Sequence, residues 1–146
     1  MVRFCMKKII IISLIFITSI FSAFSKDLNL YVDKGNGDYV FLGCFNCLPV
    51  NSKSIWNEVG KYGSVVSRDS IWNEVGPYGS EVSLFSPWNV VSSHAPVLLD
   101  GNGGFYGYFT CDISKYNRVS PDLMDFLCKN KEYIRDHRYE VYNKLF

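Results

Sequence analysis

A tandem repeat of 16 residues constrains the fold of this chain more than any other feature of its sequence. Residues 54–69 and 70–85 are identical at twelve of sixteen positions, and both begin with the letters SIWNEVG. A partial third copy, residues 86–95, carries His94 where the first two copies carry a tyrosine. Because two and a half units are too few for a free-standing solenoid, we expect the repeat to pack against the rest of a single domain.

Each repeat unit is predicted to form one short helical turn followed by a tight turn. Ser54 is a suitable N-cap for a helical turn that holds Trp56 and Glu58, and we expect Gly60 to end it in a left-handed conformation. The letters Tyr-Gly-Ser then turn the chain again. Since the indole is the largest apolar group of each unit, the favoured role of the repeat tryptophans is burial in the core.

The repeat lies between two predicted β-hairpins. Residues 28–33 and 38–43 are β-prone runs that flank a Lys-Gly-Asn-Gly turn, in which Asn-Gly supplies the positive φ angles of a tight turn. Residues 96–100 and 104–110 flank a Gly-Asn-Gly turn in the same way. Two hairpins give four antiparallel strands, which we expect to form one sheet.

The end of the chain is predicted to be helical. Ser120 followed by Pro121 is typical of a helix start, and the helix is expected to break at Asn130. Mixed charges over residues 129–140, Arg135 and Arg138 among them, indicate a solvated helix face. Apolar residues at helical spacing predict one buried stripe made of Leu123, Phe126, Leu127, Ile134 and Val141.

The fold class that these patterns predict is α+β. It consists of a small antiparallel sheet of two β-hairpins, an inserted 16-residue tandem repeat of short helical turns, and a C-terminal helical segment.

Residues 1–25 are predicted to be a removable export signal. Two lysines at positions 7 and 8 precede the apolar run 9–21, and Ala23 and Ser25 fit the −3 and −1 positions of a signal-peptidase site. The run is shorter than the roughly 20 residues that span a bilayer, so we expect no stable membrane insertion after cleavage. The mature chain, residues 26–146, is expected to be one exported domain, secreted or periplasmic.

Composition excludes several classes of partner. The mature chain holds 12 basic and 14 acidic residues without a concentrated basic face, so nucleic acid is not an expected partner. The acidic turn residues Asp33 and Asp100 lack the full ligand pattern of a calcium loop, and turn chemistry alone explains them. We therefore predict no metal site and no cofactor.

Four cysteines follow residue 25, and their even number in an exported chain predicts two disulfides. The favoured pairing joins Cys111 to Cys128 and Cys44 to Cys47, unless the last two stay reduced. The alternative joins Cys44 to Cys111 and Cys47 to Cys128. A redox role for Cys-Phe-Asn-Cys is disfavoured because a proline follows it where a helix should begin. The wide spacing of Cys111 and Cys128 does not predict a zinc site.

The repeat and its flanks resemble a group of short exported bacterial proteins and appended modules. The resemblance covers roughly residues 39–110. It rests on the tandem strings SIWNEVGKYGS and SIWNEVGPYGS, with YVFLGC before them and APVLLDGNGGFYGYFT after them. It implies export and this architecture, and it assigns no biochemical activity. From Asp112 onward the chain departs from the pattern of the group.

The favoured function is a non-catalytic binding or surface-interaction module. Its partner class is a glycan or a protein at the cell surface, which aromatic rings of the repeat could contact. The rings available for such contacts are Trp56, Trp72, Trp88, Tyr62 and Tyr78.

The alternative function is a small secreted hydrolase. His94 is a candidate base, with serines beside it and Asp100 as a possible orienting carboxylate. Glu58 and Glu74 are a second candidate set, a carboxylate pair of the kind that glycosidases use. An enzyme should gather such groups in a pocket, whereas a ring platform should expose a row of aromatic side chains.

Overall fold

The structure is a computed structural model that describes residues 26–146, so the predicted export signal lies outside the described residues. Four strands form one antiparallel sheet in the order β2-β1-β3-β4. Both predicted hairpins are confirmed, and so is their union in one sheet, because the first strand of each hairpin pairs with the other at its centre. The strands are β1 (Asn29–Asp33), β2 (Tyr39–Cys44), β3 (Val97–Leu99) and β4 (Phe105–Tyr108).

The first hairpin uses the turn chemistry that was predicted for it. Asn36 and Gly37 have φ angles of 77° and 71°, in the left-handed region that asparagine and glycine tolerate. A bulge in the pairing of β1 with β2 places Gly43 opposite Leu30 at a φ of 116°. A Cβ atom on Gly43 would lie 2.7 Å from Cγ2 of Ile55, so glycine lets the repeat approach the sheet.

Three short helices follow the sheet: α2 (Pro121–Lys129), α3 (Lys131–Asp136) and α4 (Arg138–Leu145). The predicted start at Ser120-Pro121 and the predicted break at Asn130 are both confirmed. None of the helices in residues 26–146 has the length and apolar character needed to cross a bilayer.

The predicted apolar stripe of these helices is correct in part. Leu127, Ile134 and Val141 are buried in the common core, and Leu123 packs against it. Phe126, however, is 43% exposed, and Met124 is buried instead. The two residues lie about 200° apart around the helix, so only one of them can face the core.

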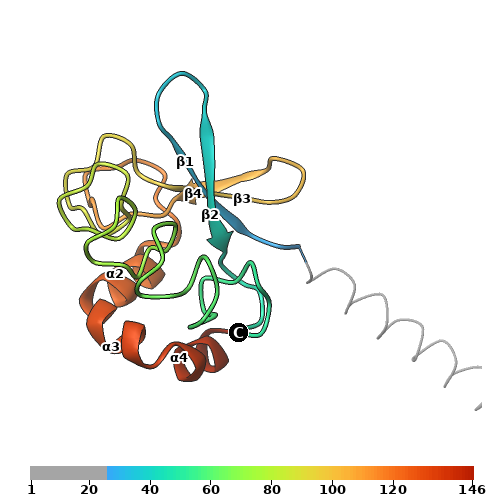
Figure 1. Cartoon of the computed structure of the whole chain (residues 1–146). Coiled ribbons are helices and arrows are strands. Elements are labelled where there is room, and N and C mark those ends of the chain that lie inside the picture. The colour runs from blue at the N-terminus through green and yellow to red at the C-terminus, as the bar shows by residue number, and fades with distance from the viewer. Residues whose placement is uncertain (1–25) are drawn as a thin grey trace, which may run out of the picture.

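The segment between β2 and β3 is wound as a series of turns and lies between the sheet and the helices in Figure 1. Backbone hydrogen bonds close these turns over three residues, as where Asn57 N–H donates to Ser54 O at 3.3 Å and Gly60 N–H to Asn57 O at 3.1 Å. The equivalent bonds recur 16 residues later, at Asn73 and Gly76.

The side chains of serine and asparagine explain why this segment forms a series of separate tight turns instead of the short helical turns that were predicted. Ser54 Oγ accepts the N–H of Trp56 at 3.1 Å, and Asn57 Oδ1 accepts the N–H of Val59 at 3.1 Å. Such bonds to the backbone two residues ahead compete with helix formation. The prediction of a left-handed Gly60 is wrong, because the chain continues directly into another turn, in which Ser64 N–H donates to Gly60 O at 2.9 Å.

Turns of the same kind begin before the first repeat. Asn51 N–H donates to Leu48 O at 2.9 Å and Ser54 N–H to Asn51 O at 3.0 Å. These bonds correspond to those of Ser67 and Ser70, sixteen residues further on. Residues 48–53 (LPVNSK) share only one valine with residues 64–69 (SVVSRD), which lie sixteen positions later. Sequence comparison therefore does not show that residues 48–53 form the same turns.

Residues 26–146 contain two disulfides, and the favoured pairing is confirmed. Cys44–Cys47 closes the loop after β2, and Cys111–Cys128 ties the segment after β4 to α2. Two disulfides are consistent with an extracellular or periplasmic protein.

Candidate functional site

The three repeat tryptophans form a column of tilted rings in contact inside the protein. Trp56, Trp72 and Trp88 are 1%, 2% and 4% exposed, and their neighbouring ring centroids lie 5.9 Å and 5.3 Å apart. The indole N–H of Trp72 donates to Ile55 O at 2.7 Å, and that of Trp88 donates to Ile71 O, in both cases 17 residues earlier. The indoles are therefore core side chains, as their size predicts, and they present no exposed row.

The C-terminal helices cover one side of this column. Nζ of Lys131 lies 5.9 Å from the ring centroid of Trp88, and the guanidinium carbon of Arg138 lies 5.9 Å from that of Trp72. The ring of Tyr142 lies 6.1 Å from that of Trp56. The helices thus cross the repeat in the opposite chain direction, and one tail residue meets each tryptophan.

Arg138 is an exception to the predicted solvated helix face. It is 3% exposed, and its Nη1 donates to Gly63 O in the repeat. Burial lowers the pKa of this guanidinium, and the nearby charge of Glu58 opposes that shift. Arg138 therefore anchors α4 to the repeat, although neighbouring Arg135 stays accessible.

The two repeat tyrosines pack next to the first hairpin. Tyr62 is half-buried, and its ring centroid lies 4.8 Å from that of Phe41 of β2 in a T-shaped arrangement. Tyr78 is buried, with Nζ of Lys34 lying 5.7 Å from its centroid. The five rings considered for a binding platform are therefore mostly engaged within the protein.

The groups around His94 are held by separate contacts. Nδ1 of His94 lies 2.9 Å from Ser93 Oγ, and the centroid of the His94 ring lies 5.4 Å from that of Phe85 in a T-shaped arrangement. The Asp100 carboxylate binds its own hairpin turn, where Gly104 N–H donates to it at 2.8 Å and Asn102 N–H at 2.9 Å. These backbone donors hold the pKa of Asp100 below its usual range. Within residues 26–146, no hydrogen bond joins His94 to Asp100.

The glutamates of the second hydrolase set are surface residues. Glu74 forms an ion pair with Arg135 of α3, and its side chain is 51% exposed. Glu58, its equivalent in the first repeat, is also exposed. A general acid of a glycosidase needs an environment that excludes water and keeps its carboxyl group protonated. Neither of the two carboxylates has such surroundings.

Two grooves lie where α3 meets the repeat. The first has a volume of about 420 Å³ and the second about 360 Å³, both within the range of ligand sites. The first is lined by Val65, Trp72, Asn73, Glu74, Val75, Arg135 and Asp136. The second is lined by Glu81, Val82, Trp88, Val90 and Lys131, together with the disulfide Cys111–Cys128.

The two grooves share part of their lining under the 16-residue repeat, although Glu74 and Glu81 hold different positions of the repeat unit. Three lining positions of the first recur sixteen residues later in the second: Val65 and Glu81, Trp72 and Trp88, Glu74 and Val90. Each groove also holds one cation of α3 that is paired with a glutamate of the repeat, Arg135 with Glu74 and Lys131 with Glu81. Each of the two grooves therefore contains hydrogen-bond donors, hydrogen-bond acceptors and apolar surface. Sequence reasoning found Glu74 here but missed the cations, whose charges looked like an ordinary solvated face.

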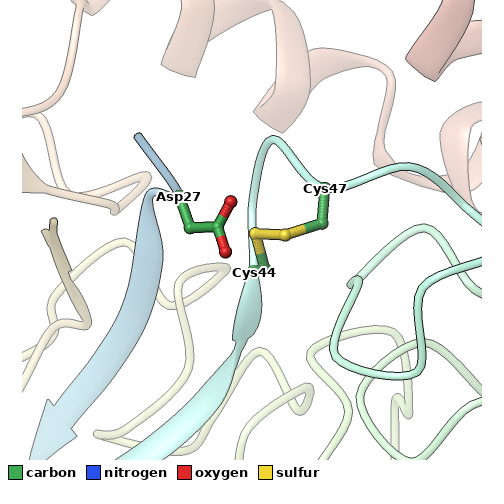
Figure 2. A group of neighbouring side chains, drawn as sticks. All are labelled: Asp27, Cys44 and Cys47. Carbon is green, nitrogen blue, oxygen red and sulfur yellow. A yellow bond between two sulfur atoms is a disulfide. The ribbon is translucent and has the colours of Figure 1, made fainter. Parts of the chain in front are cut away.

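Asp27, Cys44 and Cys47 lie together at the end of β2, as Figure 2 shows, with their oxygen and sulfur atoms within 4.8 Å of one another. The two sulfur atoms are joined in a disulfide, whereas metals bind the thiolate form of cysteine. In its oxidised form this group therefore lacks the ligands of a zinc or copper site.

Comparisons with protein-family models, with curated proteins and with solved structures each return no match for this chain.

Proposed function

We propose that this protein is an exported, non-catalytic binding module, and that it binds its partner in the two neighbouring grooves beside α3. The observation that carries the proposal is the presence of two neighbouring grooves along α3, each of which contains a glutamate paired with a cation of that helix. A pair of neighbouring grooves suits an extended partner at the cell surface, a glycan or a protein, because such a partner meets both grooves at once.

In this proposal the tandem repeat is the scaffold that sets the spacing of the grooves. The two units form equal coils, stacked through Trp56, Trp72 and Trp88. The recurrence of the same turn bonds and the same indole bonds at equal offsets supports this role. Export is supported by the signal-like residues 1–25 and by the two disulfides.

The test is a retention experiment with the natively exported, oxidised protein, bacterial cell-wall fractions and culture-supernatant proteins. We expect the wild type to retain a component and the double variant Glu74→Gln/Glu81→Gln to lose it, because one acceptor of each groove is changed. Glu58→Gln is the matched control, since Glu58 holds the same repeat position as Glu74 but lines neither groove.

Equal retention by all three proteins would count against the grooves as the binding site. Activity screens on the same sample address the hydrolase alternative. Turnover that is lost in Glu58→Gln or in His94→Ala would favour an enzyme over a binding module.

A further inference from the structure

We propose that the ligand of the two grooves is a neutral, linear, β-1,4-linked glycan that lies along α3 and places one sugar in each groove. This inference rests on the proposed function, because it takes the grooves as the binding site and names the chemistry of what they bind.

The first argument is the spacing of the two grooves. The ring centroids of Trp72 and Trp88, which line one groove each, are 5.3 Å apart. The two cations, Arg135 and Lys131, lie four residues apart on α3, or about 6 Å along a helix axis. Both distances are comparable with the length of one sugar in an extended chain. Neighbouring sugars of such a chain would therefore each meet one cation of α3 and the glutamate that pairs with it.

The second argument is that both signs of charge are present in each groove. Each groove contains a cation in contact with a glutamate, and Asp136 adds a second carboxylate to the first groove, so a polyanion or a polycation would meet a like charge in both grooves. Sugar hydroxyl groups donate hydrogen bonds to carboxylates and carry no charge that the partly buried cations would repel, so a neutral glycan suits both grooves. The carboxylates are accessible for this purpose, with 51% of the Glu74 side chain and 69% of the Glu81 side chain exposed.

The third argument is the apolar surface beside these charged pairs. Val75 in the first groove is 94% exposed, and Val82 in the second is 87% exposed. The C–H faces of β-linked sugar rings supply apolar area that such methyl groups can cover. An extended peptide would instead be expected to add to unpaired backbone groups, whereas the backbone groups of Asn73 and Gly76 named above already close turns within the repeat.

The experiment is isothermal titration of the exported, oxidised protein with glucose, with N-acetylglucosamine, and with the β-1,4-linked oligomers of each that contain two or six sugars. We expect one series to bind, with at least about tenfold higher affinity for two sugars than for one, because a single sugar fills only one groove. Glu74→Gln and Glu81→Gln should each weaken binding of the six-sugar chain about tenfold, and Glu58→Gln should leave it unchanged. An α-1,4-linked glucose hexamer, which curves, should bind more weakly than its β-linked counterpart.

Two results would overturn the glycan proposal while leaving the proposed function intact. In the first, the wild type retains a wall or supernatant component through Glu74 and Glu81 but binds neither oligomer series. In the second, that component proves to be a peptide or a protein. If oligomers bind equally well to the wild type and to both groove variants, the grooves are not the binding site and both proposals fail. Thermal unfolding of each variant establishes that it is folded before it is titrated.

Discussion

At the scale of single residues, substitution of Trp72 tests whether the buried indoles stabilise the packing of the repeat. Its ring packs between those of Trp56 and Trp88, and its N–H is bonded to Ile55 O. We expect Trp72→Ala to lower the free energy of unfolding by about 3–5 kcal/mol. Val75→Ala, at a side chain 94% exposed, should change it by less than about 0.5 kcal/mol. Urea unfolding measures both, and wild-type stability in Trp72→Ala would show that the indole is not a core group.

Gly63 and Gly101 form a second matched pair of residues. A Cβ atom on Gly63 would lie 1.9 Å from the backbone oxygen of Asn57, whereas one on Gly101 would have nothing within 4 Å. Gly63→Ala is therefore expected to destabilise the protein by at least about 1–3 kcal/mol, since the repeat must move to admit the methyl group. Gly101→Ala should be close to neutral. Thermal unfolding of the two variants makes the comparison, and equal midpoints would contradict the close packing of the repeat.

The burial of a residue could be predicted from the sequence where it depends on the size of the side chain. It could not be predicted where it depends on a partner far away in the chain. The tryptophans are the largest apolar groups of short units, so their place in the core follows from the sequence. In the sequence, Arg138 is one of several charged residues on a predicted helix. It is buried against Trp72 only because α4 crosses the repeat. No local pattern couples these two residues.

At the scale of secondary-structure elements, local chemistry explains both the correct and the wrong predictions. The first hairpin was predictable because Asn36 and Gly37 carry the signal within the turn itself. The form of the repeat was not, since Ser54 suits both a helix N-cap and a turn whose side chain binds the backbone. Turns are favoured because serine or asparagine residues, whose side chains accept backbone N–H groups two residues ahead, recur along the whole segment.

The hairpin of β3 and β4 has a pH dependence that can be measured. The N–H groups of Gly104 and Asn102 and the hydroxyl of Tyr106 bind the Asp100 carboxylate and lower its pKa. A lowered pKa stabilises the folded state above the ordinary carboxyl value of about 3.9, and this stabilisation is lost as the pH falls through the folded-state value. Asp100→Asn should therefore flatten the fall in stability between about pH 5 and pH 2.

Urea unfolding at several pH values measures this effect. Asp38→Asn, in the other hairpin, is the control and should keep the wild-type pH profile. The same acid sensitivity in Asp100→Asn and in the wild type would remove Asp100 as its source.

At the scale of the whole molecule, the grooves are a product of tertiary structure alone. Glu74 and Arg135 lie 61 residues apart in the chain, and each looks like an ordinary surface charge in its own segment. They meet because the tail crosses the tandem units, and the tail has no counterpart in the repeat pattern. The sequence could therefore indicate Glu74 as a candidate site residue, but it could not predict the groove in which Glu74 lies.

The last prediction concerns the mature form of the chain. Asn46, in the loop closed by Cys44–Cys47, donates from Nδ2 to Lys26 O and accepts from Leu28 N–H, both at 2.8 Å. The fold therefore holds the chain from Lys26 onward, and cleavage after Ser25 would leave every one of these contacts intact. Mass spectrometry of the natively exported protein should find Lys26 at the N-terminus and a mass lowered by four hydrogens. An uncleaved chain in which Cys44, Cys47, Cys111 and Cys128 are all free thiols would contradict both the export proposal and the structural role of the disulfides.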